Sequence, residues 1–157
     1  MTTKTKRTKA GTRTRAPRPR TKLSSSRERM PSLVRTRSLR EVFVLVGKAG
    51  EILWADASDS PAALPDSRAR WEAIWSRRDD IDIIAHSHPI GPSAFSAEDE
   101  STMAALDDAL GTPMRYAVVA PRVTIVRQGL RAPVDKLIPE PWWVALVRLA
   151  SGMTKEE

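Results

Sequence analysis

The chain has 157 residues and no cysteine. Disulfide bonds, thiol catalysis and cysteine-bound zinc are therefore excluded, although the lack of cysteine does not fix the compartment. No apolar run approaches the length of a transmembrane helix, and the N-terminal segment lacks the apolar core of a secretory signal. We therefore expect a cytoplasmic protein that makes no membrane contact.

Acidic residues are scarce at the start of the chain. Residues 1–40 hold fourteen Lys or Arg and a single acid, whereas the remainder holds twelve basic and eighteen acidic residues, so the formal charges are +13 and −6. Residues 1–32 have almost no large apolar side chains, which predicts a disordered basic tail followed by one folded domain over residues 33–157. Two interpretations of the tail stay open. Residues 1–40 either attach non-specifically to nucleic acid or another polyanion, or serve as a solubilising spacer.

Histidine is also rare. The two histidines of the chain stand in His86-Ser87-His88, at the end of an apolar run, and residues 81–88 predict a strand. Side chains two residues apart in a strand point to the same face, so both imidazoles can reach one metal ion. Pro89 cannot donate a hydrogen bond to a neighbouring strand and should end this one.

A carboxylate follows a few residues later. Ser96 predicts the N-cap of a helix over residues 97–110, and Asp99 lies one turn inside it. This is an ordinary capping pattern that needs no metal to explain it, but the same loop can return Asp99 to the imidazoles. Two imidazoles and one carboxylate suit zinc and leave a fourth position for water, as in catalytic sites. We therefore predict that His86, His88 and Asp99 bind Zn²⁺.

The order His-Ser-His-Pro, six residues, then Ser-x-x-Asp resembles the signature of the JAMM metalloproteases, also called JAB or MPN+ domains. All five signature positions are present, namely His86, Ser87, His88, Ser96 and Asp99. The resemblance implies a zinc-dependent peptidase or isopeptidase that cleaves a bond at the C-terminus of a ubiquitin-like protein. Short connections around the motif favour a compact bacterial-type member that acts on a small ubiquitin-like protein or a peptide.

In the JAMM family an upstream glutamate that does not bind the metal acts as the general base. Glu41, at the start of a predicted strand, matches that position, and Glu51, at a predicted hairpin tip, is the alternative. Glu41 could also be a solvated charge paired with Arg40. The resemblance further implies that the Ser96 hydroxyl orients water or stabilises the oxyanion. Ser87 is expected to face away from the metal and to make a supporting hydrogen bond.

Strand and helix patterns alternate along the domain. Strands are predicted over residues 41–46, 52–55, 81–88, 115–120 and 123–128, and helices over 66–78, 97–110 and 141–151. Residues 32–38 could form a short edge strand or a lead-in, and residues 131–140 are predicted to be a linker. This order predicts an α/β fold, a three-layer sandwich with a mixed sheet between helices. The JAMM resemblance implies the same fold, with a curved sheet related in shape to the cytidine deaminases.

The tryptophans of the first helix and the apolar final helix allow two further predictions. Trp71 and Trp75 have helical spacing and are predicted to be core residues. The final helix, over residues 141–151, is apolar nearly all round, so it either packs within its own domain, which is the favoured interpretation, or forms a dimer face.

A second function comes from another class of protein. The hairpin after Glu41 and the His-x-His-Pro stretch also resemble the RadC-like proteins, which have been linked to DNA. Those proteins usually have His-Asn-His-Pro-Ser-Gly, whereas this chain has His-Ser-His-Pro-Ile-Gly, and the difference favours the peptidase. In the alternative, the basic tail binds DNA or RNA and the metal site is secondary.

Overall fold

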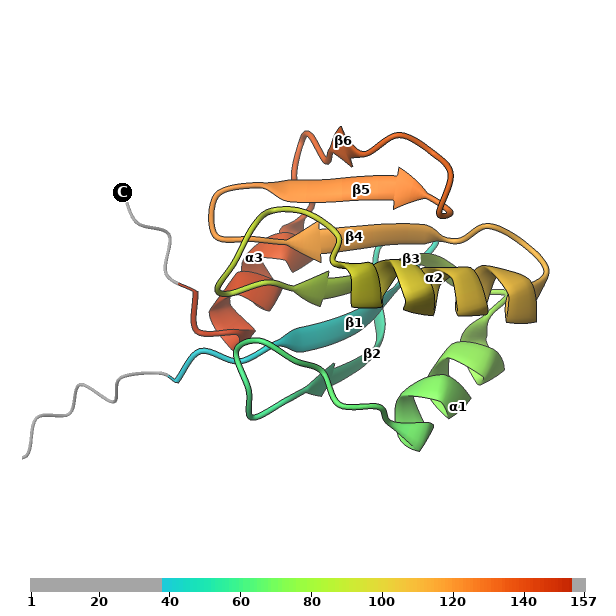
Figure 1. Cartoon of the computed structure of the whole chain (residues 1–157), viewed down its shortest axis with the longest axis horizontal. Helices are drawn as coiled ribbons and strands as arrows, with labels where there is room; N and C mark the ends of the chain where they lie inside the picture. Colours follow the sequence, from blue (N-terminus) through green and yellow to red (C-terminus); the bar gives the residue numbers. More distant parts are fainter. Residues whose placement is uncertain (1–37, 154–157) are drawn as a thin grey trace, which may run out of the picture. The chain divides into compact units, whose positions relative to one another are not determined.

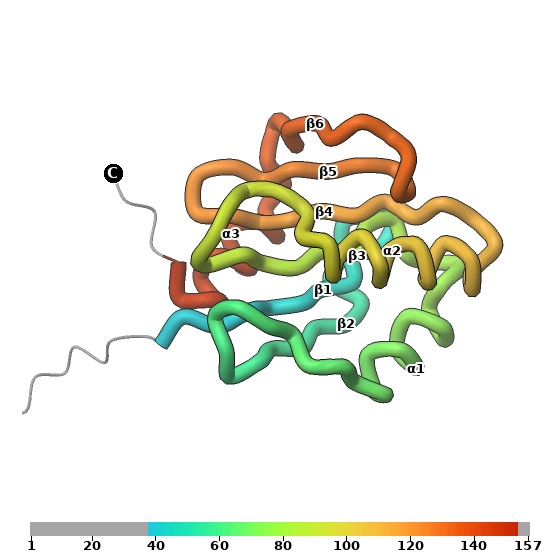
Figure 2. Tube along the Cα trace, in the orientation of Figure 1, coloured from blue at the N-terminus to red at the C-terminus, as the bar shows by residue number. Residues whose placement is uncertain are grey.

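A six-stranded mixed sheet organises the fold in the computed structural model, which describes residues 38–153. The elements in chain order are β1 (Val42–Gly47), β2 (Ile52–Ala57), α1 (Arg68–Arg77), β3 (Ile81–Ser87), α2 (Ala97–Leu110), β4 (Arg115–Val119), β5 (Thr124–Gln128), β6 (Asp135–Lys136) and α3 (Trp142–Ala150). The strand order is β2-β1-β3-β4-β5-β6, and all neighbours are antiparallel except β3 and β4. The tube in Figure 2 shows β2 and β6 at the two edges.

The helices cover both faces of the sheet. Figure 1 shows α1 and α2 on one face and α3 on the other. The core on the α3 face consists of Val42, Val44, Val46, Ile83, Ala85, Ala117, Val119, Trp143, Val144, Val147 and Met153. The core on the α1 and α2 face consists of Phe43, Leu45, Ala73, Ile74, Ile81, Ile84, Met103, Leu106, Met114 and Tyr116. Alternate residues of β1 and β3 therefore enter different cores, and the predicted three-layer α/β sandwich with a curved mixed sheet is confirmed.

Most predicted elements lie within a few residues of their expected bounds. The exception is the predicted linker over residues 131–140, because Asp135 and Lys136 form β6 and pair with Val126 and Ile125. The predicted tail, residues 1–32, and nearly all of the segment 32–38 lie outside the described residues.

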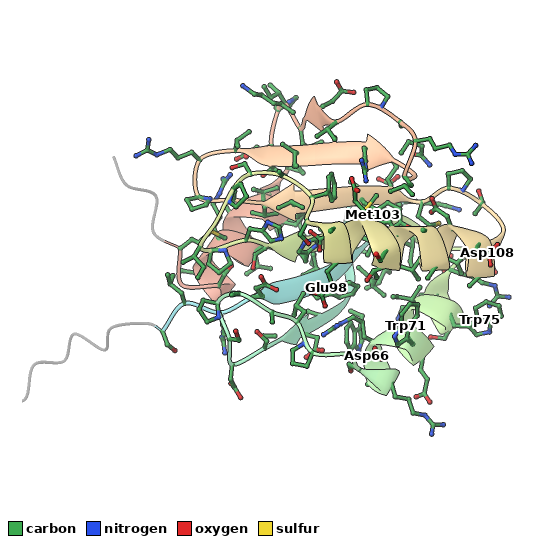
Figure 3. The ribbon with its side chains drawn as sticks, in the orientation of Figure 1. Asp66, Trp71, Trp75, Glu98, Met103 and Asp108 are labelled. Atoms are coloured by element: carbon green, nitrogen blue, oxygen red, sulfur yellow. The ribbon has the colours of Figure 1, made fainter. Side chains whose placement is uncertain are left out.

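The two tryptophans of α1 are not core residues, so that prediction is wrong. Trp71 is 38% exposed and Trp75 is 55% exposed. The residues that α1 buries are Ala73 and Ile74. The Trp75 ring instead lies under the Arg78 guanidinium, whose carbon is 4.8 Å from the ring centroid. The helix thus meets the sheet through one narrow face, and both tryptophans, one turn apart, lie outside that face (Figure 3).

Internal packing of α3 is confirmed for one of its faces. Its buried residues are Trp143, Val144 and Val147, and its exposed large apolar residues are Trp142, Leu146 and Leu149. The Trp142 indole N–H donates to the backbone carbonyl of Gly50 at 3.1 Å, which ties the helix to the β1–β2 turn. Among residues 38–153, no helix has the length and apolar character needed to cross a membrane.

Candidate metal centre

The end of β3 sets the direction of both imidazoles. His86 lies opposite Val118 of β4 in parallel register, and the backbone N–H of His88 donates to the carbonyl of Val119 at 2.9 Å. Sheet hydrogen bonding therefore continues one residue past β3, and the two histidine side chains share the face that carries α1 and α2. Gly91 then turns the chain with φ of +108°, a conformation that side chains with a Cβ rarely adopt.

Ser87 points to the opposite face of the sheet. It is fully buried, and its hydroxyl oxygen accepts a hydrogen bond from the backbone N–H of Val42 at 2.8 Å. The expectation that this residue faces away from the histidines and makes a supporting hydrogen bond is confirmed.

The first turn of α2 holds Asp99 through a capping box. Ser96 Oγ accepts a hydrogen bond from the Asp99 backbone N–H at 3.1 Å, and Asp99 Oδ2 accepts one from the Ser96 backbone N–H at 2.7 Å. The other carboxylate oxygen, Oδ1, lies 3.0 Å from His86 Nε2. Asp99 can therefore serve both as part of the helix cap and as a metal ligand, because the cap directs its carboxylate at the imidazoles.

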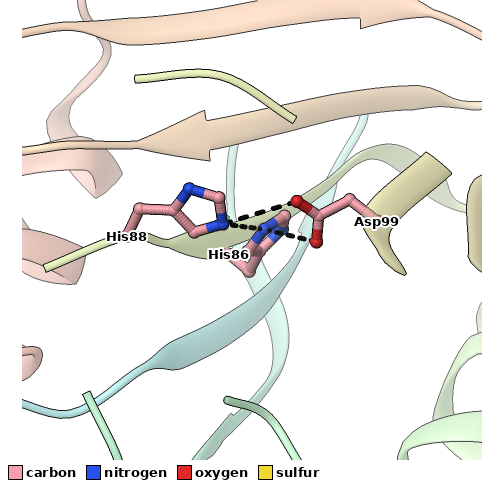
Figure 4. Close-up of side chains that lie close together, drawn as sticks. All are labelled: His86, His88 and Asp99. Atoms are coloured by element: carbon pink, nitrogen blue, oxygen red, sulfur yellow. Dashed lines mark hydrogen bonds and ion pairs between the residues drawn. The ribbon is translucent and has the colours of Figure 1, made fainter. Parts of the chain in front are cut away.

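Three potential ligand atoms converge at this point (Figure 4). His86 Nε2 is 3.0 Å from His88 Nε2, and His88 Nε2 is 3.4 Å from Asp99 Oδ2. Zinc–ligand distances of about 2.0–2.1 Å in a tetrahedron place ligand atoms about 3.3 Å apart, so this donor set fits three of four positions. His88 Nδ1 lies 3.3 Å from the carbonyl oxygen of Pro92, and an N–H donated there leaves Nε2 free to bind a metal.

The cluster alters the acidity of its members. Burial alone would raise the pKa of Asp99, but hydrogen bonds from His86 and His88 hold that pKa far below its ordinary value. Burial alone would lower the pKa of His88, but the hydrogen bond to Asp99 and its charge raise the pKa overall. Asp99 is therefore ionised at neutral pH, which is the state a metal ligand needs.

Glu41 lies at the same cavity as the cluster. It immediately precedes β1, and its N–H donates to the carbonyl of Ser60 at 2.8 Å, while its carbonyl accepts from the N–H of Ser58 at 2.9 Å. The residue is only 7% exposed, and burial raises the pKa of its carboxyl group. Its side chain lines a cavity of about 700 Å³ that His86, His88, Ser96 and Asp99 also line.

The alternatives to Glu41 lie elsewhere. Glu51 is exposed, its carboxylate covers Gly47, and it does not line this cavity. Arg40 and Glu41 form no ion pair in the described structure, and the Arg40 guanidinium Nε instead donates to the carbonyl of Ala150 at 3.0 Å. The fold therefore brings Glu41, and not Glu51, to the histidines.

The remaining walls of the cavity were not identified from sequence. They come from the loop before α1, from α1, from the β3–α2 loop and from α2, and include Leu64, Trp71, Phe95 and Thr102. No spacing in the sequence joins these residues, because only the packing of the two helices on the sheet brings them together. The aromatic ring of Trp71 is a signal in the sequence, but its helical spacing predicts a core residue and not a cavity wall.

Comparison with known families agrees with this geometry. Residues 26–133, more than half of the chain, match the family model of prokaryotic homologs of the JAB domain. Comparison with curated proteins gave no match. The family and the His-His-Asp cluster together support a JAMM-like hydrolase. The mixed sheet, the arrangement of its helices and the matched residues lead to one conclusion: the chain belongs to the family of prokaryotic JAB-domain homologs.

Proposed function

We propose that this protein is a zinc-dependent peptidase or isopeptidase of the JAMM type. The observation that carries the proposal is the convergence of two imidazoles and one carboxylate, 3.0–3.4 Å apart, in a cavity that a buried glutamate also lines. Three protein ligands leave one position open, which is the arrangement of catalytic zinc sites. A purely structural zinc site would use four protein ligands.

Each residue has a distinct task in the proposed reaction. Zinc held by His86, His88 and Asp99 would supply Lewis acidity to a carbonyl group and acidify water. Glu41 accepts the proton of the attacking water and passes it to the leaving amine, and the raised pKa of its carboxyl group suits this exchange. The Ser96 oxygen already accepts from the Asp99 N–H, so its hydroxyl hydrogen can be donated to the developing oxyanion.

The proposed substrate class is inferred from the family. The resemblance of this chain to JAMM enzymes favours the C-terminus of a ubiquitin-like protein, or a peptide, as the segment that enters the cavity. The RadC-like alternative depends on nucleic-acid binding by residues 1–40, and the described part of the chain offers no observation in its favour. We therefore put the peptidase first.

The proposal is tested by zinc content and hydrolysis in three proteins. The natural sequence, His88→Ala and Asp82→Asn are compared by elemental analysis and by turnover of a ubiquitin-like protein fused to a reporter. Asp82 is a matched control on β3, because its carboxylate pairs with Arg115 at 2.8 Å and lies outside the cluster. We expect one zinc per chain and hydrolysis in the natural and Asp82→Asn proteins, and neither in His88→Ala.

Two results would contradict the proposal in different ways. Full zinc occupancy in His88→Ala would show that the ligand assignment is wrong. A zinc-loaded natural protein that cleaves neither peptide nor isopeptide bonds would show that the site has another use.

A further inference from the structure

The cavity at the cluster continues between α1 and α2 and becomes apolar. Away from the histidines, its walls are mostly hydrophobic side chains, and the largest are Leu64, Trp71, Ile74, Phe95, Met103 and Leu106. The whole cavity, with the cluster included, has a volume of about 700 Å³, which is enough for a sizeable ligand group. A glycine has no side chain to place in such a space. The apolar part of the cavity therefore offers contacts that glycine cannot make.

Trp71 is fixed in place although it is 38% exposed. Its indole N–H donates to Asp66 Oδ1 at 2.7 Å, and this carboxylate lies just before α1 (Figure 3). A ring held in this way offers apolar contact area at little entropic cost, as in the aromatic anchors of binding sites. Trp75, one turn later on the same helix, does not line the cavity.

The charges at the cavity are mainly negative. Asp66 and Glu98 are exposed acids that line it, and Arg70, which also lines it, is paired with Asp56 at 2.9 Å. Acidic groups on a ligand would meet like charges here. The charges therefore disfavour an acidic group, and the apolar walls favour a bulky apolar one.

We propose that this cavity is a specificity subsite for a large apolar side chain, of the size of leucine or phenylalanine, next to the cleaved bond. The inference rests on the proposed peptidase function and narrows it. Among ubiquitin-like and peptide substrates, the protein selects those with a bulky apolar residue on one side of the scissile bond over those with glycine at that same position. Burial of such a side chain is expected to raise kcat/KM at least about tenfold over glycine.

The first test measures binding without catalysis. N-acetyl amides of leucine, phenylalanine, glycine and aspartate are titrated into the protein, and the indole N–H signal of Trp71 is followed by NMR. The signal is assigned by its loss in Trp71→Phe. We expect the leucine and phenylalanine amides to shift it and the glycine and aspartate amides to leave it unchanged.

Matched variants locate the effect. Thr102 is exposed on α2 and lines the cavity, so Thr102→Trp should fill the space and abolish the binding of both apolar amides. Ala105→Trp places the same ring at an exposed α2 position outside the cavity and should leave binding intact. Isothermal titration calorimetry with the leucine amide, which needs no indole signal, should show weaker binding in Trp71→Ala and unchanged binding in Trp75→Ala.

The second test compares kcat/KM for zinc-loaded protein on peptides that differ only in the residue before the cleaved bond, or only in the residue after it. A preference of at least about tenfold for leucine or phenylalanine over glycine in one series, lost in Thr102→Trp, supports the subsite. Cleavage without such preference overturns the subsite and leaves the proposed function standing. Selective binding of the apolar amides without cleavage of any peptide overturns the proposed function instead. Equal shifts by the glycine and leucine amides overturn the subsite.

Discussion

The hydroxyl of Ser87 accepts a hydrogen bond from the backbone N–H of Val42 at 2.8 Å, and so joins the residue between the two histidines to the residue after Glu41. The bond crosses from β3 to β1 on the face of the sheet opposite the cavity. It fixes the start of β1, which carries the proposed base, against the end of β3, which carries two proposed ligands.

Ser87→Ala should therefore destabilise the protein by about 1–3 kcal/mol, because it leaves a buried N–H without this acceptor. Ser151→Ala is the matched control, since Ser151 is equally buried but its hydroxyl donates to the Val147 carbonyl within the same turn of helix. That change leaves no donor unpaired and should cost less. Urea denaturation of the metal-free proteins measures both values. Equal losses of unfolding free energy in the two variants would show that the hydrogen bond to Val42 contributes no more than the local bond of Ser151.

Glu41→Gln should separate zinc binding from catalysis. The amide keeps the size of the side chain but cannot accept the proton of water, so hydrolysis should fall by about a hundredfold or more while zinc stays near one per chain. Glu51→Gln, at the exposed turn, should change neither quantity. Zinc analysis and turnover of a ubiquitin-like fusion test all three proteins. An active Glu41→Gln beside an inactive Glu51→Gln would reverse the assignment, and loss of zinc in Glu41→Gln would make Glu41 a ligand.

Asp99→Asn tests whether the helix cap and the ligand can be separated. The asparagine oxygen can still accept the Ser96 N–H, so the helical circular dichroism signal should be nearly unchanged. The loss of negative charge should sharply weaken zinc binding in a competition titration with a chelator. Glu98→Gln, one residue earlier, removes the same charge outside the ligand set and should retain zinc. Equal zinc loss in the two variants would point to general electrostatics.

The Glu140–Arg148 pair should add to stability in a defined pH range. The Arg148 guanidinium bonds both Glu140 carboxylate oxygens at 2.6 Å, and these bonds lower the pKa of Glu140 from its ordinary 4.5. A lowered folded-state pKa means that the contribution is complete above about pH 4.5 and is lost as the pH falls through the folded-state value. Glu140→Gln should therefore lower the melting temperature of the metal-free protein at pH 7 more than at pH 3.

Glu72→Gln provides the control for this pH dependence. Glu72 and Arg68 also form an ion pair, but the two side chains are 63% and 91% exposed, so solvent screens them. The melting temperature of Glu72→Gln should follow that of the natural sequence at both pH values. If Glu140→Gln lowered the melting temperature equally at pH 3 and pH 7, the substitution would act through packing and not through charge.

The basic tail should bind nucleic acid without sequence preference, if it binds at all, and the affinity should fall steeply with salt. Each neutralised phosphate releases counterions, so the slope of log affinity against log salt increases with the number of contacts. Binding of two unrelated DNA duplexes at two salt concentrations measures this. The chain from residue 33 onward should lose the binding. Tight, sequence-selective binding by that shorter chain would favour the RadC-like alternative.

Much of the fold could be predicted because its signals are local. The apolar residues of β1, the apolar run before His86 and the Ser96–Asp99 cap each specify their own segment within a few residues. The cluster could be predicted for the same reason, since Gly91 and the cap confine the loop that joins Asp99 to the histidines.

The remaining features depend on tertiary contacts. Nothing in Asp135 and Lys136 indicates a strand, and they become one because β5 offers a free edge. Helical spacing predicts a core position for Trp71, and this is wrong because Asp66 accepts the indole N–H and so allows the ring to remain at the surface. The cavity could not be predicted from the sequence, because its walls belong to segments that only the packing of α1 and α2 on the sheet brings together.

The position of α3 has a consequence for the order in which the chain can fold during synthesis. The proposed ligands and base all lie before residue 100, yet the valines of β1 on the opposite face are covered by residues 143–147. At about 5–20 residues per second, the ribosome needs several seconds to add the roughly fifty residues between Asp99 and the end of α3. Throughout that interval the strands that carry the site have one bare apolar face. A fragment ending at residue 133, where the family match stops, would keep that face bare permanently, and should be captured by chaperones or aggregate.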